Sequence, residues 1–474
     1  MLHCSTTTAK LLATLIAVCF FFSETSYANV AKSKRRRSSS VTLVSTTLSG
    51  STAEERLAEC SEKIERMLRS WNRGKVGVLI QTDDNETIFT KYPNDLFKPA
   101  SNLKLITSAV ALEKLGPDFK YRTDFFIDGE IKNGVLHGNL ILAGTTDPLL
   151  SGFFDRDIND IVREWADTFT MLGITKIVGD VILDNSYYVG NKTPVVNGEP
   201  IRFATMASFK RASESQLNKV STVRTIKTKS GQKRVVRRGF RRRSRLKMVS
   251  IEPNTYCANA LLSELQARGI VDDDKTLKKI TYSKTLDRTA WKHIYTYFSL
   301  SLYQALKITN KSSDNFYADQ LLRTLGGEFY GEGTIEKGLE VVKEFLVKNV
   351  GVARKEFQLS DGSGLSHNNT VTPHLIIEVM RYMRLRGKYF KEYYNSLAVP
   401  MAEGTLVGRI HHPLAQNIRA KTGSITGVSS LSGYLTSRNG KQIYFAIIGN
   451  GSGRRYSRNF ARVEDTICKL LLEI

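Results

Sequence analysis

The sequence predicts an α+β fold: an antiparallel sheet with terminal helices packed on it and a helical subdomain between its strands. Two observations predict it. Strand-like segments occur near both ends of the chain and are flanked outside by helix-like segments, and the segment between them shows mostly helical periodicity. The 474 residues are 41% hydrophobic and 24% charged. This composition is typical of a globular protein with a sizeable core, and it excludes wholesale disorder and a polytopic membrane protein.

Apolar spacing and turn residues divide the chain into elements. Leu103, Ile106 and Val110 form one stripe of a helix that Gly116-Pro117 ends. An Asn133-Gly134 turn joins two β-rich segments as a hairpin. The predicted helices cover 53–71, 101–116, 158–172, 255–267, 291–307, 316–325, 335–350 and 457–474. The predicted strands cover 75–81, 87–92, 122–128, 135–143, 176–183, 418–421, 431–436 and 442–449.

Basic residues are concentrated in two segments. Residues 210–247 hold fifteen Lys or Arg and one acid, Glu214, and 32–37 add five more positive charges. Since the whole chain carries +23, the remainder is only mildly basic and need not be a nucleic-acid-binding fold. Residues 191–254 are poor in apolar side chains, so we expect a mobile insertion without a core of its own.

The first 28 residues have the order of a secretory signal peptide. Lys10 precedes an apolar run at 11–22, and Ser26-Tyr27-Ala28 fits a cleavage site. The run is short for a bilayer span, although an uncleaved anchor is the alternative. Lipidation at Cys19 is disfavoured because the residue before it is too large for that cleavage. We expect an exported protein of the periplasm or cell envelope, with a flexible, basic and Ser/Thr-rich arm at 29–51.

Three cysteines, Cys60, Cys257 and Cys468, remain once the signal is removed. Export permits a disulfide, and the odd number leaves at least one free thiol. No CxxC pair or Cys/His cluster has the spacing of zinc ligands. The sequence therefore predicts neither a metal site nor a cofactor.

A serine and a lysine stand one helical turn apart at the start of the predicted helix 101–116. In Ser101-x-x-Lys104 the amine lies on the same helix face as the hydroxyl. A serine hydroxyl is a weak nucleophile until a base takes its proton, and a lysine is such a base where desolvation or another cation favours its neutral form. The free N–H groups of a helix start also suit a developing oxyanion. The pattern alone is weak, since Ser230-x-x-Lys233 repeats it in the basic stretch.

Two further motifs follow in the chain. Ser313-Asp314-Asn315 precedes a helix, where its structural interpretation is a cap. Lys421-Thr422-Gly423-Ser424 ends a predicted strand, where a lysine and a hydroxyl can grip a carboxylate and a glycine lets a substrate backbone come close. Each motif is weak by itself. Their order, Ser-x-x-Lys, Ser-Asp-Asn and Lys-Thr-Gly, is the signature of penicillin-binding proteins and class A β-lactamases.

The chain resembles the low-molecular-mass penicillin-binding proteins of the D-Ala-D-Ala carboxypeptidase/endopeptidase family, the DacB-like or peptidase S13 type. The 212 residues from Ser101 to Ser313 are too many for a compact β-lactamase, and this family carries a large insertion there. The resemblance covers about 75–185 and 255–470. The matching blocks lie at 98–109, 115–119, 138–148, 311–318, 361–366, 404–406 and 420–424.

This resemblance implies a penicillin-recognising serine transpeptidase/β-lactamase-like fold with an inserted accessory region. It also implies an acyl-enzyme mechanism on peptidoglycan stem peptides, and acylation by β-lactams. Ser101 would attack the carbonyl of a D-alanyl bond, with Lys104 as its base. Ser313 would relay a proton toward the leaving amine.

The resemblance also assigns substrate contacts. Asn315 would hold the substrate amide, and Lys421 and Thr422 would bind the terminal carboxylate. The backbone N–H groups of Ser101 and Ser424 would form the oxyanion hole. Water would then release the peptide.

Two departures from the family pattern affect side-chain specificity. Residues 191–250 lack the Trp-rich segment with an acidic residue that helps relatives bind the diamino acid of the stem peptide. His367 follows the 361–366 block where relatives often have arginine. His367 and Gly423 are two further substrate-binding candidates. The implied division is a DD-peptidase domain at 52–120 and 255–474, an accessory subdomain at 121–190 and the basic insertion at 191–254.

In this family's fold the terminal helices lie side by side. That arrangement would bring Cys60 near Cys468. A disulfide between them is one expectation, and two free buried thiols are the other.

Two other functions compete with this interpretation. A class A β-lactamase needs a glutamate, in a Glu-x-x-Leu-Asn type loop, to activate the deacylating water, and none occurs between Asn315 and Lys421. Slow deacylation, and hence penicillin binding, is therefore favoured. A non-catalytic wall-associated protein that adheres through its basic segment is the alternative from another class, and the three intact motifs argue against it.

The basic segment 210–247 suggests a partner, whether the protein is an enzyme or a non-catalytic wall-associated protein. Its net charge of +14 predicts an electrostatic tether to a polyanion such as outer-membrane phosphates, anionic phospholipid or a wall polymer. Export would keep it from nucleic acid, so no specific nucleic-acid partner is expected.

Overall fold

The computed structural model describes residues 44–144, 147–151, 157–184, 253–280 and 289–474, and the backbone of short strands between 195 and 250. The predicted signal peptide and Ser230 lie outside the described residues, as does the arm up to residue 43. None of the helices in the described ranges has the length and apolar character of a membrane span.

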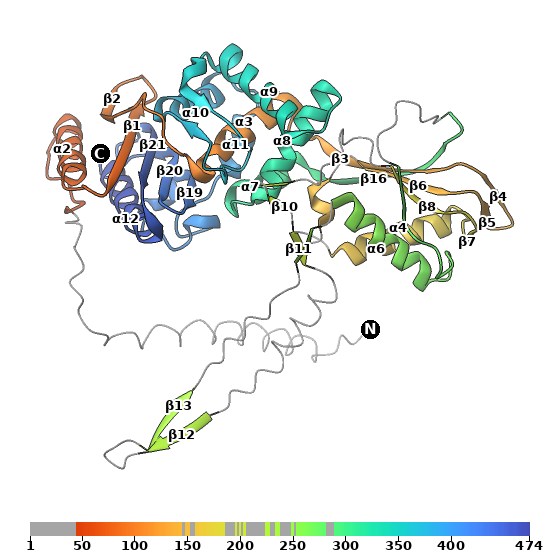
Figure 1. Cartoon of the computed structure of the whole chain (residues 1–474). Coiled ribbons are helices and arrows are strands. Elements are labelled where there is room, and N and C mark those ends of the chain that lie inside the picture. Colours follow the sequence, from red (N-terminus) through yellow and green to blue (C-terminus); the bar gives the residue numbers. More distant parts are fainter. Residues whose placement is uncertain are drawn as a thin grey trace, which may run out of the picture. The chain divides into compact units, whose positions relative to one another are not determined.

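Five antiparallel strands form the first sheet, in the order β19-β20-β21-β1-β2 (Figure 1). Strand β1 pairs along its whole length with β21, from Gly74 opposite Gly451 to Thr82 opposite Ile443. The sheet therefore joins the two ends of the folded chain and leaves β19, which carries Lys421, at its edge. The five strands are β1 (Gly74–Thr82), β2 (Thr87–Lys91), β19 (Ile418–Ile425), β20 (Val428–Thr436) and β21 (Gln442–Gly451).

Two terminal helices, α2 (Ala53–Arg69) and α12 (Gly453–Leu472), lie beside each other at this sheet (Figure 1). The capping box of Thr52 and Glu55 starts α2, and Trp71 after its end packs on Phe460 of α12 with ring centroids 5.3 Å apart. A large apolar core joins the sheet to the helical segment. That segment contains η1 (Ala100–Asn102), α3 (Leu103–Leu115), α7 (Leu302–Lys311), α8 (Asn315–Tyr330), α9 (Ile335–Phe345), the π-helical turn η3 (Leu346–Val350), η4 (Arg354–Glu356), β17 (Phe357–Gln358), β18 (Thr370–Val371), α10 (Pro373–Leu385), α11 (Phe390–Ser396), η5 (Gly404–Leu406) and η6 (Ala415–Asn417). The predicted α+β class is confirmed.

A second sheet is inserted between α3 and α7, in the order β15-β8-β6-β3-β16. Helices α4 and α6 pack together and share a second apolar core with it, in which Trp165 and Phe125 are buried. The predicted Asn133-Gly134 turn is present, with both residues at positive φ. The elements are β3 (Lys120–Ile127), β4 (Glu130–Lys132), β5 (Val135–His137), β6 (Leu140–Gly144), η2 (Pro148–Ser151), α4 (Ile158–Met171), β7 (Lys176–Ile177), β8 (Val181–Asp184), α6 (Pro253–Ala267), β15 (Lys278–Ile280) and β16 (Lys292–Ser301).

The helix predicted at 291–307 is wrong over most of its length. Residues of β16 pair with β3, and only α7 after Ser301 is helical. The segment is rich in β-branched and aromatic residues, which suit a pleated surface, and Tyr297 packs on Trp165 at 5.2 Å. Because α6, β15 and β16 belong to the second sheet and core, we propose that the accessory region extends to Ser301 and not to 190.

Of the two alternatives for Cys60 and Cys468, the disulfide is wrong and the pair of free buried thiols is confirmed. Cys60, Cys257 and Cys468 are all free and buried. Burial raises the pKa of Cys60 to about 12 and that of Cys468 well above its usual value, so both thiols stay protonated and unreactive.

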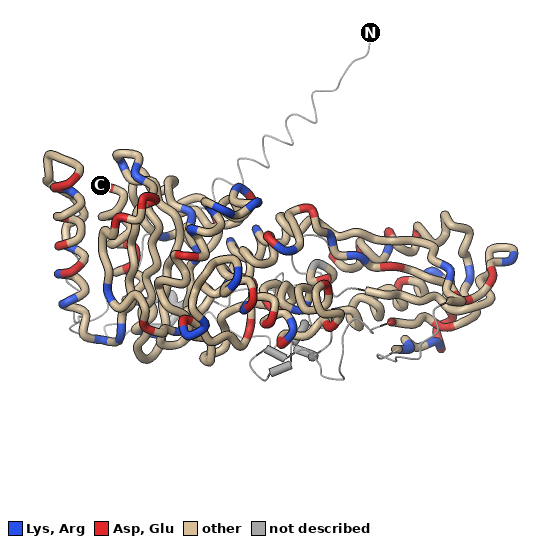
Figure 2. Tube along the Cα trace, turned by 90° about the horizontal axis from the view of Figure 1, so that it is seen from above, with Lys and Arg blue, Asp and Glu red and all other residues tan. Residues whose placement is uncertain are grey.

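Within the basic insertion, the structure describes short paired strands that the sequence did not predict. Strand β12 (Val223–Lys227) pairs antiparallel with β13 (Lys233–Arg237). The others are β9 (Val195–Val196), β10 (Glu199–Pro200), β11 (Arg202–Ala204) and β14 (Met248–Ser250). Over the fully described residues, acidic and basic residues alternate along the chain trace (Figure 2).

Candidate active site

Ser101 and Lys104 lie where η1 passes into α3. Lys104 has 0% exposure, and its Nζ lies 3.1 Å from Ser101 Oγ, 2.7 Å from Asn315 Oδ1 and 2.7 Å from the carbonyl oxygen of Ser363. The last two atoms can only accept hydrogen bonds. A neutral amine has two N–H groups for these two acceptors, and its lone pair is then left for the Ser101 hydroxyl.

Burial also favours the neutral form of this lysine. Desolvation lowers the pKa of Lys104 to about 8, although the negative charges of Asp319, Asp361 and Asp314 oppose the shift. Desolvation, with the nearby charge of Lys104, holds the pKa of Lys421 well below its usual value. The site therefore disfavours two charged lysines at once.

Lys421 and Ser313 form the second pair. Lys421 is fully buried on β19 and donates to Ser313 Oγ at 2.8 Å and to the carbonyl oxygen of Thr422 at 2.9 Å. Ser313, in the turn between α7 and α8, has φ +59°. Asp314 caps α8 by accepting a hydrogen bond from the N–H of Tyr317 at 2.9 Å. This is the helix cap that the sequence offers as the structural interpretation of the motif.

The carbonyl of Ser363 is positioned by a buried acid on α8. Asp319, one turn after Asn315, accepts from the N–H groups of Gly362 at 2.9 Å and Ser363 at 3.0 Å. Gly364 has φ +79°, and a Cβ there would lie 1.8 Å from the carbonyl oxygen of Ala100. The 361–366 block thus forms a tight loop that packs against Ala100, the residue before Ser101.

Sequence reasoning missed the roles of Asp319 and Ser363. Asp319 carried one signal, since an acid four residues after Asn315 lies on the same helix face. The contribution of Ser363 comes from its backbone carbonyl, so no side-chain pattern could identify it.

Variants of Asp319 test whether its carboxylate stabilises the loop that carries Ser363. In Asp319→Ala two buried N–H groups lose their acceptor, so we expect a loss of about 2 kcal/mol or more in the free energy of unfolding and slower acylation. Burial and the charge of Asp361 raise the pKa of Asp319, so Asp319→Asn is a close mimic that keeps an acceptor oxygen and should lose less. Urea denaturation of both variants measures the difference. Equal losses would contradict the role of the two hydrogen bonds.

Gly423 lets β19 approach the backbone of Ser101, the candidate nucleophile. A Cβ at this position would lie 2.7 Å from the carbonyl oxygen of Pro99 and 3.0 Å from the nitrogen of Ser101. Any other residue at this position would force the backbone of β19 or of Pro99 and Ser101 to move. The edge strand therefore lies directly against the backbone of Pro99 and Ser101.

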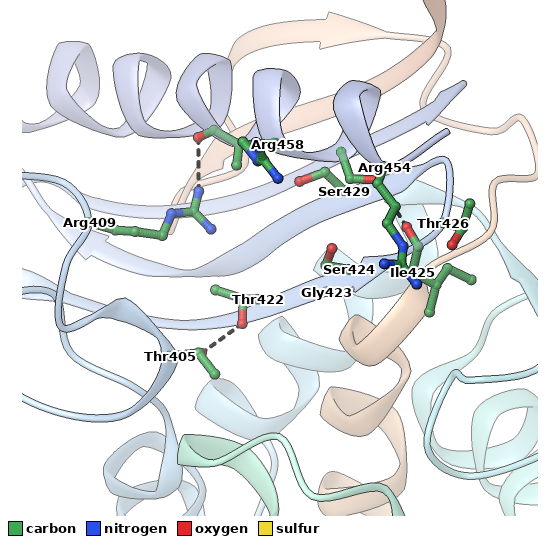
Figure 3. A pocket seen from close by; sticks show the side chains of 12 residues that line it. Thr405, Arg409, Thr422, Gly423, Ser424, Ile425, Thr426, Ser429, Arg454 and Arg458 are labelled. Atoms are coloured by element: carbon green, nitrogen blue, oxygen red, sulfur yellow. Dashed lines mark hydrogen bonds between the residues drawn. The ribbon is translucent and has the colours of Figure 1, made fainter. Parts of the chain in front are cut away.

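An open pocket of about 600 Å³ borders the outer side of β19 (Figure 3). It is lined by Thr422, Ser424 and residues of α12, and Thr422 Oγ1 lies 2.7 Å from Thr405 Oγ1. His367 is exposed and does not line this pocket. In the described part of the chain, no group of His, Cys, Asp or Glu side chains is arranged to hold a metal ion.

Known proteins match this chain in sequence and structure. The chain is 26% identical over 428 residues to a D-alanyl-D-alanine carboxypeptidase DacB of Haemophilus influenzae, covering 79% of this chain and 85% of the relative. It is 26% identical over 460 residues to a D-alanyl-D-alanine carboxypeptidase of Actinomadura sp. (strain R39), covering 84% and 82%. The crystal structure of penicillin binding protein 4 (dacB) from H. influenzae matches with a TM-score of 0.66 at 22% identity, covering 88% of this chain and 99% of that one.

The family comparison covers nearly the whole described chain. The model of the D-Ala-D-Ala carboxypeptidase 3 (S13) family matches residues 60–200 and 192–469. These ranges include all three motifs and the strands and helices that hold them. The chain belongs to the D-Ala-D-Ala carboxypeptidase 3 (S13) family.

Proposed function

We propose that the protein is a serine D,D-peptidase that cleaves D-alanyl bonds of peptidoglycan stem peptides through an acyl-enzyme and is acylated by penicillin. One observation carries the proposal. The buried amine of Lys104 lies 3.1 Å from Ser101 Oγ, while two acceptor-only carbonyl groups occupy its N–H donors. A neutral lysine in this position is a general base for the serine.

The acylation step uses both serine–lysine pairs. Ser101 Oγ attacks the carbonyl carbon of the D-alanyl bond and passes its proton to Lys104. The oxyanion is held by the N–H groups of Ser101 and Ser424. The C–N bond breaks as Ser313, hydrogen-bonded to Lys421, passes its proton to the leaving amine and is reprotonated by the proton that Lys104 had taken from Ser101, so that Lys104 is neutral again. Water then attacks the ester, frees the peptide and returns the proton to Ser101.

The polar contacts support distinct substrate roles. Oδ1 of Asn315 is taken by Lys104, so its Nδ2 is the atom that remains to hold a substrate carbonyl. The hydroxyl of Thr422 donates a hydrogen bond to the hydroxyl of Thr405. If Thr405 becomes the donor instead, the proton of Thr422 is free to bind a terminal carboxylate. When Lys104 is neutral, its repulsion of a charge on Lys421 is absent, and a protonated Lys421 adds positive potential beside the carboxylate.

Release of D-alanine from a purified D-Ala-D-Ala-ended pentapeptide tests the proposal. We expect stoichiometric D-alanine from the wild type and inhibition by penicillin. A protein that takes up penicillin but releases no D-alanine, and cleaves no cross-linked dimer, would contradict the proposed activity.

The pH dependence of acylation follows from Lys104. The reactive form is the neutral amine, and its pKa is lowered to about 8 by burial, so the rate should rise as pH increases through about 8 and then level off. An unshifted lysine would need a far more alkaline solution. Second-order rates with fluorescent penicillin between pH 6 and pH 10 measure this profile. A rate that is flat or falling from pH 7 to pH 9 would remove Lys104 as the base.

We also propose export by residues 1–28 to the periplasm or cell envelope, and contact of 210–247 with a polyanion there. Deleting 210–247 removes a net charge of +14, so retention on phosphatidylglycerol vesicles at low salt should fall several-fold. Penicillin acylation should persist. Co-sedimentation across a salt series measures the effect, and retention that ignores both the deletion and salt would leave the segment without this role.

A further inference from the structure

The pocket beside β19 continues past the residues proposed to bind the terminal carboxylate. Thr422 and Ser424 line one side of it, and the first turns of α12 line the other (Figure 3). A leaving group that extends beyond its first carboxylate would therefore enter this pocket. Its volume of about 600 Å³ leaves room for a further side chain or residue.

Two exposed arginines of α12 line this pocket. Arg454 and Arg458 are four residues apart and so lie on one helix face, and Figure 3 shows Arg454 reaching toward Ile425 and Thr426. Among the described residues, neither arginine has a salt-bridge partner. Arg409, which also lines the pocket, differs because it pairs with Glu464 at 2.8 Å and Asp465 at 2.7 Å.

Helix stability does not account for these arginines. The N-terminus of a helix carries partial positive charge, so cations in its first turn are unfavourable. The first turn of α12 contains Arg454 and no acidic residue, and Ser452 makes no side-chain capping bond. Uncompensated positive charge thus gathers at one wall of a pocket whose other wall bears hydroxyl groups.

We propose that Arg454 and Arg458 form a subsite for a second carboxylate on the leaving side of the scissile bond. This inference rests on the proposed function, because Lys421 and Thr422 must hold the first carboxylate. The planar guanidinium fork matches a carboxylate bidentately, and two such groups strongly favour an anionic leaving group over a neutral one. The enzyme then prefers a leaving residue with two carboxylates to one with a single carboxylate, which suits the longer leaving strand of a cross-link better than free D-alanine.

Two peptides that differ in one group test the subsite. Diacetyl-L-Lys-D-Ala-D-Glu and diacetyl-L-Lys-D-Ala-D-Gln have leaving residues of the same shape, and only the first carries a second carboxylate. The full-length wild type should cleave the D-Glu peptide with a kcat/KM about tenfold higher, and the preference should shrink as salt rises. Rates are normalised to the fraction of Ser101 that fluorescent penicillin labels.

Arginine variants then locate the preference. Arg454→Gln combined with Arg458→Gln should bring the D-Glu/D-Gln ratio close to one, mainly through KM. The matched control, Arg455→Gln combined with Arg462→Gln, removes two exposed arginines of the same helix that do not line the pocket and should keep the wild-type ratio.

The outcomes separate this inference from the proposed function. A ratio near one in a wild type that is labelled by penicillin and cleaves both peptides overturns the subsite alone, as does a ratio that the double variant keeps. If neither peptide is cleaved, calorimetric titration of both into Ser101→Ala still measures the preference. Equal affinities there overturn the subsite, and a tenfold difference supports it even if the proposed hydrolysis fails.

Discussion

Replacing Ser101 with alanine is expected to abolish covalent labelling by fluorescent penicillin. In the proposed mechanism the acyl bond forms on Ser101 Oγ, and no other described serine has its hydroxyl in hydrogen-bond contact with Lys104. Alanine removes only the oxygen from a partly exposed side chain, so the melting temperature should stay close to that of the wild type. Gel fluorescence after incubation with a tenfold excess of the penicillin measures the labelling.

Ser230→Ala is the matched control, because Ser230-x-x-Lys233 repeats the spacing of the motif. Its labelling should equal that of the wild type. Labelling that survives in Ser101→Ala, or that is lost in Ser230→Ala, would place the nucleophile elsewhere.

The local part of this site was predictable from the sequence. Ser101 and Lys104 are three residues apart in a helix, so their contact follows from helix geometry. The contact between Lys421 and Ser313 joins residues 108 positions apart, and only the order of motifs and the family resemblance indicated it. Local periodicity cannot predict such a pair, because it depends on how β19 packs against the helical segment.

Other parts of the site could not be predicted because backbone groups and burial create them. The carbonyl of Ser363 accepts from Lys104 whatever side chain Ser363 carries. The lowered pKa of Lys104 depends on its complete burial, which a stripe containing Leu103 and Ile106 only suggests. Arg454 was missed because the last helix begins at Gly453, four residues before the predicted start.

The fold shows the same division between local and distant causes. The terminal helices and the five strands of the first sheet follow from spacing and turn residues, and the predicted antiparallel sheet is confirmed. Residues 292–301 contain aromatic and β-branched residues that satisfy a helical and a strand pattern about equally. The segment forms a strand because it pairs with β3 and because Tyr295 packs on Phe125.

Replacing Lys104 with methionine is expected to lower the acylation rate by about two to four orders of magnitude, the usual contribution of a general base. Methionine fills a similar volume without a charge or a lone pair for the serine proton. Two opposing effects act on stability. Asn315 Oδ1 and the Ser363 carbonyl lose a donor, at about 1–3 kcal/mol each, whereas the desolvation of a buried ammonium group is relieved by a comparable amount. The melting temperature should therefore change little while the rate collapses.

The pH profile distinguishes a lost base from a distorted site. Residual acylation in Lys104→Met should no longer rise as pH increases through about 8, because the group that titrates there in the wild type is gone. Lys114→Met, an exposed position on the same helix, should keep both the wild-type rate and its profile. If Lys104→Met is slow but still accelerates through this pH range, another group is the base, and Lys421, the other buried lysine of the site with a lowered pKa, becomes the candidate.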